Sequence, residues 1–303
     1  MIKILQGNCL DKLKELPDQS INTCITSPPY WGLRDYGEGE QLGMEDTPEE
    51  FVNNMVEVFR EVKRVLRDDG TVWLNLGDSY SSGGRTTTTN QSLRGDKDYG
   101  VTRPKPSKGI KPKDLIGIPW RVAFALQQDG WYLRQDIIWH KPNPMPESVK
   151  DRCTKAHEYI FLLSKSPKYY FDNEAIKEDA KFPDVPNTPK SIKAVDGVYS
   201  KNLQKIGANP KRNKRSVWTV TTKPFKGAHF ATFPMDLIEP CVLAGCPENG
   251  TVLDPFGGSG TTGIVASNHN RKAVLIELNT EYIEIARQRI QNQGGLFTDL
   301  EIE

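Results

Sequence analysis

Short apolar runs rich in β-branched residues alternate along the chain with longer segments in which apolar residues recur at helical spacing. The short runs predict strands and the longer segments predict helices. The predicted strands cover residues 2–5, 23–26, 71–76, 133–139, 159–163, 251–254 and 273–277. Because strands that alternate with helices are typical of a mainly parallel sheet covered by helices, we predict an α/β fold.

The strongest helix signal follows Met44. Thr47 can cap this helix, Pro48 suits its first turn, and Glu50 completes a capping box. The apolar stripe that follows at helical spacing consists of Phe51, Met55, Val58, Val62 and Val65. Further helices are predicted over residues 114–127, 235–243, 261–268 and 280–291.

Two segments lack this periodicity. Residues 81–113 are rich in Gly, Ser, Thr and Pro and predict a long mobile loop, and residues 182–226 are rich in Pro and Lys. Loops of this length inside a domain are usually functional or disordered.

Composition and charge narrow the class of protein. Hydrophobic residues make up 37% of the chain and charged residues 26%, and no apolar run approaches the ~18 residues of a membrane span. Five dispersed cysteines without a C-x-x-C pair indicate reduced thiols in a cytoplasm. The net charge is only +1, but basic residues gather in 85–113 and 190–226 and acidic residues in 35–61. This segregation suits a cationic face for phosphates, although solvated loops explain it equally well.

A glycine-rich turn predicts a nucleotide-type cofactor site. Residues 254–263 read Asp-Pro-Phe-Gly-Gly-Ser-Gly-Thr-Thr-Gly, follow an apolar strand and open a helix. Glycines let a backbone turn sharply and approach a ligand closely. Glu277 ends the next predicted strand, about 20 residues further on, where a carboxylate can accept hydrogen bonds from ribose hydroxyls.

The same glycines also fit the fingerprint of a nicotinamide oxidoreductase. Only one further strand is predicted after this motif, so the usual βαβαβ half cannot be completed in sequence order. The remaining strands would have to come from the N-terminal part of the chain, as in a circular permutation. This counts against an oxidoreductase.

A second motif lies near the start of the chain. Residues 26–31 read Thr-Ser-Pro-Pro-Tyr-Trp at the end of a predicted strand, where open α/β sheets bind their ligands. The two prolines predict a stiff turn with exposed carbonyls, which can face an amine while Tyr30 offers a flat ring for stacking. Taken alone, the tetrapeptide could simply be a loop that ends a strand.

Together, the two motifs and their order resemble the DNA N4-cytosine and N6-adenine methyltransferases in which S/D-P-P-Y precedes F-x-G-x-G. The resemblance spans nearly the full length, although an Asp is common in the family where Asn8 stands. It implies a circularly permuted, Rossmann-like, doubly wound and mostly parallel seven-stranded methyltransferase sheet in one domain, residues 1–303. It also implies an inserted target-recognition region over 164–226 and a mobile basic loop over 81–113.

The resemblance further implies S-adenosylmethionine as cofactor, double-stranded DNA as substrate, and no metal. The implied catalytic residues are Ser27, Pro28, Pro29 and Tyr30. The implied cofactor-binding residues are Asn8, Cys9, Thr26, Phe230, Ala231, Asp254, Phe256, Gly257, Gly258, Ser259, Gly260, Thr261, Thr262, Glu277 and Asn279. The implied DNA-binding residues are Lys141, Lys211, Arg212, Lys214 and Arg215. Residues 75–80 and 139–144 resemble walls of the active site, and residues 229–234 resemble a segment that caps the adenine of the cofactor.

The expected chemistry is direct displacement on a base that has swung out of the duplex. The Ser27 hydroxyl and the Pro28 carbonyl would accept the N–H bonds of the exocyclic amine, so no covalent enzyme intermediate is needed. Cys241 follows a proline, as the nucleophile of C5-cytosine methyltransferases does, but its apolar helical surroundings predict a packed thiol. Serine at the first motif position favours cytosine N4 over adenine N6.

Alternatives remain open beside this interpretation. They are an N6-adenine methyltransferase, an RNA or protein methyltransferase, and a non-catalytic DNA-binding module that has kept the fold. A homodimer and a cognate restriction endonuclease are further partners that the family allows. We expect a cytoplasmic protein of bacterial, archaeal or phage origin.

Overall fold

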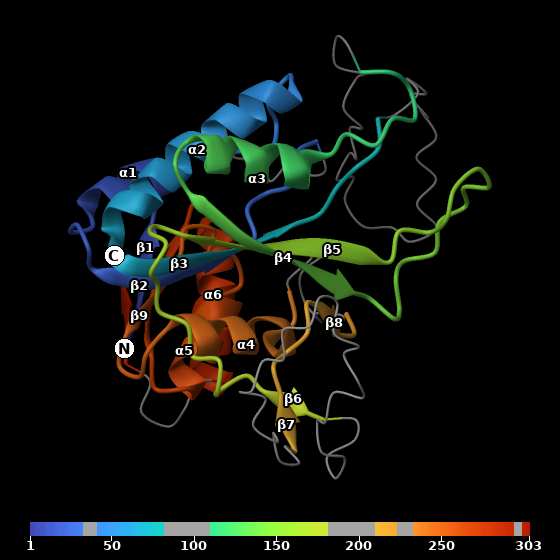
Figure 1. The fold of residues 1–303 in the computed structure, drawn as a ribbon. Coiled ribbons are helices and arrows are strands. Elements are labelled where there is room, and N and C mark those ends of the chain that lie inside the picture. The colour runs from blue at the N-terminus through green and yellow to red at the C-terminus, as the bar shows by residue number, and fades with distance from the viewer. Residues whose placement is uncertain (33–40, 82–109, 181–209, 223–232, 294–298) are drawn as a thin grey trace, which may run out of the picture.

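A large twisted sheet forms the centre of the molecule in the computed structural model, which describes residues 1–32, 41–81, 110–180, 210–222, 233–293 and 299–303 (Figure 1). The order of its nine strands is β11-β1-β10-β9-β2-β3-β5-β4-β8. These strands are β1 (Ile2–Gln6), β2 (Ile21–Thr26), β3 (Leu66–Leu76), β4 (Tyr132–His140), β5 (His157–Ser164), β8 (Val217–Thr219), β9 (Thr251–Asp254), β10 (Lys272–Glu277) and β11 (Leu300–Ile302). Two short strands, β6 (Glu178–Asp179) and β7 (Lys211–Arg212), pair separately and antiparallel.

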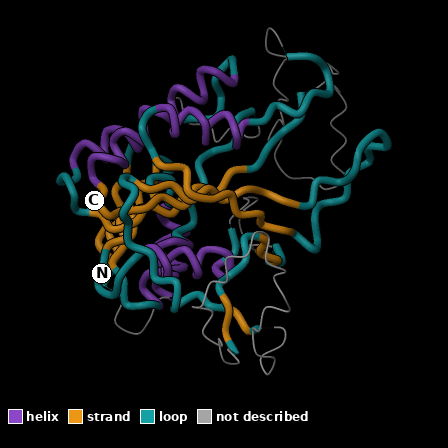
Figure 2. Tube along the Cα trace, viewed as in Figure 1, coloured by secondary structure: helices purple, strands orange, loops and turns teal. Residues whose placement is uncertain are grey.

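Helices cover both faces of the sheet (Figures 1 and 2). One face carries α1 (Cys9–Glu15), α2 (Pro48–Val65) and α3 (Ile118–Gln128), and the other carries α4 (Met235–Gly245), α5 (Thr261–Asn268) and α6 (Thr280–Gln293). Each helical layer packs on the sheet through its own apolar cluster. Within the nine-stranded sheet, β5 runs antiparallel to both of its neighbours and the other pairs are parallel. The predicted doubly wound, mostly parallel α/β fold is therefore confirmed.

The strand order also confirms the permutation. β10 pairs with β1 and β9 pairs with β2, so the two strands that flank the glycine motif lie between the first two strands of the chain. The N-terminal strands β1 and β2 therefore complete the sheet around the glycine motif, in place of strands that would otherwise follow the motif in the sequence.

Local signals predicted α2 well. Thr47 Oγ1 accepts from the Glu50 N–H at 3.2 Å, and the Glu50 carboxylate accepts from the Thr47 N–H at 3.3 Å, which makes a complete capping box. The predicted apolar stripe is fully buried against the sheet. The predicted helix 261–268 coincides with α5.

Four details of the prediction were wrong. The helix expected from residue 114 begins at Ile118, because the Asp78 carboxylate accepts from the Gly117 and Ile118 N–H groups and so caps the helix from a distant loop. α1 was not predicted. A second strand, β11, follows the glycine motif and pairs with β1 at the edge of the sheet. With β8 at the opposite edge, the sheet has nine strands instead of seven.

Among the described residues, α2 is the longest helix, and none of the helices is both long and apolar enough to cross a bilayer.

Candidate active site

The two sequence motifs leave the sheet side by side. β2 and β9 are parallel neighbours, with Thr23 opposite Val252 and Cys24 opposite Leu253. The residues that follow them, Ser27–Tyr30 and Gly257–Gly260, therefore both start from the C-terminal ends of the parallel strands, on the same side of the sheet. The side chains of the two strand ends are also joined, because Thr26 Oγ1 donates to Asp254 Oδ1 at 2.6 Å.

Asp254 fixes the shape of the glycine loop from within. Its carboxylate also accepts from Thr262 Oγ1 at 2.6 Å and from the Phe256 N–H at 3.1 Å. Only 1% of Asp254 is exposed, and burial raises the pKa of its carboxyl to about 6. Asp254 and Thr262, two of the predicted cofactor-binding residues, thus use their side chains to hold each other and the loop.

The loop needs glycines for two reasons: its backbone packs closely against β10, and it turns through left-handed conformations. A Cβ on Gly257 would lie 2.9 Å from Leu275 Cβ, which is too close for a real contact. Gly258 and Gly260 have φ values of +49° and +77°, in the left-handed region that favours glycine. The loop is also held by Arg289 of α6, whose Nη1 donates to the Ser259 carbonyl at 2.6 Å and to Thr261 Oγ1 at 3.0 Å. Arg289 was not anticipated from the sequence.

Glu277 ends β10 beside this loop. Its carboxylate accepts from the Gly258 N–H at 2.8 Å and from the Asn279 N–H at 2.9 Å, and burial raises the pKa of the carboxyl. Its carbonyl accepts from the Gly7 N–H at 3.0 Å, which brings the Gly7–Cys9 segment to the same edge. The Asn8 side chain caps α1 by accepting from the Leu10 N–H at 2.9 Å. Cys9 is buried, and this burial raises the pKa of its thiol to about 12.

The Ser27–Tyr30 turn is tied to the neighbouring strands through the Tyr30 hydroxyl. Tyr30 Oη donates to the Glu158 carboxylate of β5 at 2.8 Å and lies 3.3 Å from Asn75 Oδ1 of β3. Ser27 Oγ donates to Tyr30 Oη at 3.4 Å. Glu158 is also paired with Lys141, which follows β4. β3 and β5 therefore both contact the Tyr30 hydroxyl, and Lys141 is connected to it through Glu158.

Gly77 makes room for the ring of Tyr30. A Cβ at Gly77 would lie 2.5 Å from Tyr30 Cε2, so a larger residue there would force the ring to move. The predicted wall motif 75–80 is therefore in direct contact with the Ser27–Tyr30 motif. Glu158 itself was not anticipated, because the predicted strand began one residue later, at 159; a charged residue entering a buried strand was the signal.

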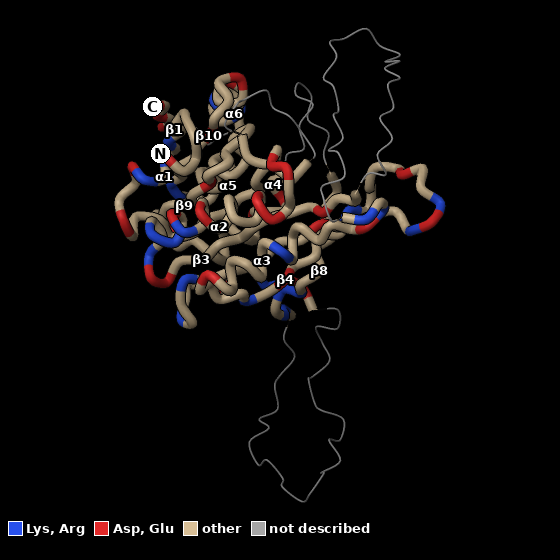
Figure 3. Tube along the Cα trace, turned by 90° about the horizontal axis from the view of Figure 1, so that it is seen from above, with Lys and Arg blue, Asp and Glu red and all other residues tan. Residues whose placement is uncertain are grey.

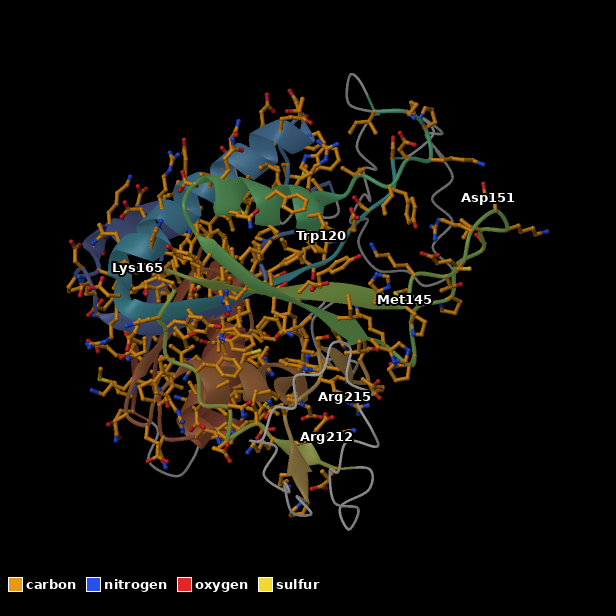
Figure 4. The ribbon with its side chains drawn as sticks, in the orientation of Figure 1. Trp120, Met145, Asp151, Lys165, Arg212 and Arg215 are labelled. Atoms are coloured by element: carbon orange, nitrogen blue, oxygen red, sulfur yellow. The ribbon has the colours of Figure 1, made fainter. Side chains whose placement is uncertain are left out.

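The predicted DNA-binding cations have acidic or aromatic partners. Lys211 pairs with Asp179 at 2.7 Å, and Arg212 and Arg215 both pair with Glu178, at 2.9 and 2.6 Å. The remaining two contact aromatic rings: Lys141 Nζ lies 4.2 Å from the ring centre of Trp139, and Lys214 Nζ lies 5.0 Å from that of Trp218. Figure 4 shows Arg212 and Arg215 near the β6–β7 pair, and Figure 3 shows Lys and Arg interleaved with Asp and Glu over the described elements.

Several expectations concern residues outside the described part of the chain. These are the cofactor-binding residues Phe230 and Ala231 together with the rest of 229–232 in the adenine-capping segment, residues 82–109 of the 81–113 loop, and residues 181–209 and 223–226 of the target-recognition region.

Cys241 packs inside α4 with 1% of its surface exposed, and burial raises the pKa of its thiol. This confirms the packed thiol predicted from its apolar neighbours. Across the described ranges, the His, Cys, Asp and Glu side chains form no group of three that could hold a metal ion.

Comparison with known proteins connects this geometry to a family. Residues 21–288 match the N6_N4_Mtase family model, described as DNA methylase. The chain is 50% identical over 290 residues to the Type II methyltransferase M.Cfr9I of Citrobacter freundii, an alignment that covers 96% of this chain and 88% of that protein. It is also 50% identical over 291 residues to M.SmaI of Serratia marcescens, with 95% and 90% covered.

Two solved structures share the fold. The cytosine-N4-specific PvuII DNA methyltransferase superimposes with a TM-score of 0.64 at 20% identity, covering 98% of this chain and 94% of that chain. The DNA modification methylase TTHA0409 of Thermus thermophilus, in complex with S-adenosyl-L-methionine, gives 0.62 at 22% identity and covers both chains fully. The family model spans most of the chain and half of the residues are shared with the first relatives, so this protein belongs to the DNA methylase family of N6 and N4 methyltransferases.

Proposed function

We propose that this protein transfers a methyl group from S-adenosylmethionine to N4 of cytosine in double-stranded DNA. One observation carries the proposal: the Ser27–Tyr30 turn and the Gly257–Gly260 loop follow adjacent parallel strands and are linked by the Thr26–Asp254 hydrogen bond. A motif suited to an exocyclic amine and a motif suited to a nucleotide-like cofactor thus share one edge of the sheet.

The residues present fit the cofactor. A Cβ on Gly258 would lie 3.8 Å from the Phe256 carbonyl oxygen, the nearest described atom outside its chain neighbours, so a ligand can approach the loop backbone there. Glu277 places a carboxylate at the end of β10 for ribose hydroxyls. Asn279 follows the end of β10, and Asn8 and Cys9 stand at the start of α1, next to the Gly7–Glu277 hydrogen bond. A neighbour of similar fold was solved with S-adenosyl-L-methionine. When bound, the cofactor supplies an activated methyl group on a sulfonium.

The chain's own residues bind and orient the base. The exocyclic nitrogen is a poor nucleophile because its lone pair is delocalised into the ring. Ser27 Oγ and the Pro28 carbonyl accept its two N–H bonds, which frees the lone pair for the methyl group. Tyr30 stacks on the extruded base and recovers part of the cost of unpairing it, and alignment then contributes several kcal/mol.

Cytosine is favoured over adenine by Ser27, since serine at this position goes mostly with N4-cytosine in the family and aspartate mostly with N6-adenine. The PvuII enzyme of similar fold is cytosine-N4-specific. The alternative is N6 methylation of adenine.

Labelled-methyl transfer to duplex DNA, followed by digestion to nucleosides and mass spectrometry, tests the proposal. We expect N4-methylcytosine, and we expect Ser27→Ala and Pro28→Ala to abolish the signal. N6-methyladenine would overturn the choice of base, and absence of transfer to DNA would favour a non-catalytic module or an RNA or protein substrate. Those substrates are offered in parallel.

We further propose that the enzyme belongs to a Type II restriction–modification pair, because its 50%-identical relatives are Type II methyltransferases. Its target would be selected by the region of residues 164–226, with the basic 81–113 loop as a second DNA contact. Sequencing the methylome of cells that express the protein would give the modified base and its sequence context together.

A further inference from the structure

A chain of hydrogen bonds leads from the candidate catalytic serine to a partly buried ion pair between Glu158 and Lys141. Ser27 Oγ donates to Tyr30 Oη at 3.4 Å, and Tyr30 Oη lies 2.8 Å from Glu158 Oε2. The first contact is long, as catalytic hydrogen bonds often are before the substrate is bound.

The direction of this chain follows from the number of protons. A tyrosine hydroxyl has one proton, and the Glu158 carboxylate is both closer and a stronger acceptor than Asn75 Oδ1 at 3.3 Å. With that proton committed to Glu158, Tyr30 Oη can only accept from Ser27. The Ser27 proton then points at Tyr30, and the lone pairs of its oxygen are left for a partner on the other side.

This direction matters for an amine substrate. The exocyclic amine offers N–H donors and needs its lone pair for the methyl group. A serine that donated its proton to this nitrogen would occupy that lone pair and block transfer. A serine that accepts from the amine leaves the lone pair free.

Glu158 is held in place by its neighbours. Its side chain is 15% exposed and is paired with Lys141, whose side chain is 18% exposed and lies over the Trp139 ring. Asn75 Nδ2 donates to Glu158 Oε2 at 3.3 Å and to the Tyr159 carbonyl at 3.0 Å. The position of the carboxylate is therefore fixed by three strands, β3, β4 and β5.

We propose that Glu158 is a positioning residue for methyl transfer: by accepting the hydrogen bond of the Tyr30 hydroxyl, it makes Ser27 an acceptor toward the substrate amine. The proposal rests on the proposed function. It assigns to Glu158 an action through Tyr30 and Ser27, without contact to the base.

Single-turnover methyl transfer tests this role, because it reports the chemical step without product release. We expect Glu158→Gln to lower the single-turnover rate by about 10- to 100-fold, the loss typical of a hydrogen bond to a charged group. KM values for DNA and for S-adenosylmethionine should stay within about twofold of wild type, because neither substrate touches Glu158. A purely structural role would change KM and thermal stability together with the rate.

A double-mutant cycle isolates the path. Tyr30→Phe keeps the ring for stacking and removes the hydroxyl that joins Ser27 to Glu158. If Glu158 acts through Tyr30, the double variant should be no slower than the slower single variant. The proposal would be overturned if the rate loss of the double variant were the product of the two single rate losses, or if Glu158→Gln had the wild-type rate. If Glu158→Gln folds poorly, a wild-type rate in Tyr30→Phe overturns it in the same way.

Glu147→Gln is the matched control. Glu147 also pairs with a cation, Arg152 at 2.5 Å, and lies in the loop between β4 and β5 that carries Met145 and Asp151 in Figure 4. Its rate should equal that of wild type. Failure of the wild-type protein to methylate DNA would reject the proposed function itself, whereas methylation that is insensitive to Glu158→Gln would reject only the role of Glu158.

Discussion

At the scale of single residues, Gly77 sets the position of Tyr30. A Cβ there would lie 2.5 Å from Tyr30 Cε2, so we expect Gly77→Ala to displace the ring and lower the methyl-transfer rate by at least about tenfold, since small misplacements at a reacting centre cost that much or more. Gly117→Ala is the control, because its φ of +77° makes a side chain unfavourable although nothing lies within 4 Å of a Cβ there. The control should lose stability but keep its rate; equal loss of rate in both would attribute the Gly77 effect to stability.

Lys141 gives a second prediction at this scale. It was expected to bind DNA, and its ammonium group pairs with Glu158 and lies over Trp139. We expect Lys141→Met to lower the methyl-transfer rate and to leave the salt dependence of DNA binding unchanged. Loss of a phosphate contact would instead flatten the plot of log Kobs against log salt concentration by about 0.9. Fluorescence titrations of a labelled duplex at several salt concentrations distinguish the two roles.

At the scale of elements, the predictions succeeded where the signal is local. The cap and the apolar stripe of α2 both lie within its own sequence. The glycine loop is likewise predicted by the residues that directly follow β9. β8 and β11 have three residues each, which is too short for an alternation of apolar and polar residues to be recognised. They form because the backbones of β4 and β1 are available for pairing. Glu158 and Arg289 acquire their roles from neighbours that are distant in sequence. A charge at the start of a buried strand marks Glu158 as unusual, but no local pattern identifies its partner.

The β6–β7 pair carries a prediction of its own. Arg212 and Arg215 share Glu178, although 36% and 67% of their side chains are exposed. Since the carboxylate competes with phosphates for these guanidinium groups, we expect Glu178→Gln to tighten binding to DNA of any sequence and to steepen its salt dependence. Glu174→Gln is the control, because it removes one negative charge from a carboxylate that pairs with Lys177 instead of with the two arginines. Equal effects in both variants would mean that the change in net charge alone explains the tighter binding. Weaker DNA binding by Glu178→Gln would mean that the ion pairs keep the two arginines in the conformation that binds DNA.

At the scale of the whole molecule, one buried carboxylate links the N-terminal part of the chain, which holds the S-P-P-Y motif, to the C-terminal part, which holds the glycine motif. Asp254 of β9 accepts from Thr26 of β2 and from Thr262 of α5, so it links the segment with the S-P-P-Y motif to the segment with the glycine motif. The order of the motifs predicted that these segments meet, because strands missing after the glycine motif had to come from the N-terminal part. The link through a single carboxylate could not be predicted, since the register between β2 and β9 decides it.

This carboxylate should make folding stability depend on pH. Burial raises the pKa of Asp254 from 3.8 to about 6 in the folded protein. Between these two pH values the folded state binds a proton that the unfolded state has released. The stabilisation is therefore fully present below about pH 4 and is lost as the pH rises through 6, and two pKa units correspond to roughly 3 kcal/mol of unfolding free energy.

Comparison with Asp254→Asn measures this contribution, because the asparagine does not titrate and the other ionisable groups are present in both proteins. The difference includes the coupling to Glu277, whose pKa the charge of Asp254 helps to raise. We expect the unfolding free energy of wild type minus that of the variant to fall by about 3 kcal/mol between pH 4 and pH 7. Urea unfolding at intervals of half a pH unit measures it. A difference that stays flat or rises with pH would mean that the hydrogen bonds from Thr26 and Thr262 outweigh the burial of the charge, so that the junction between the two motifs stabilises the ionised carboxylate.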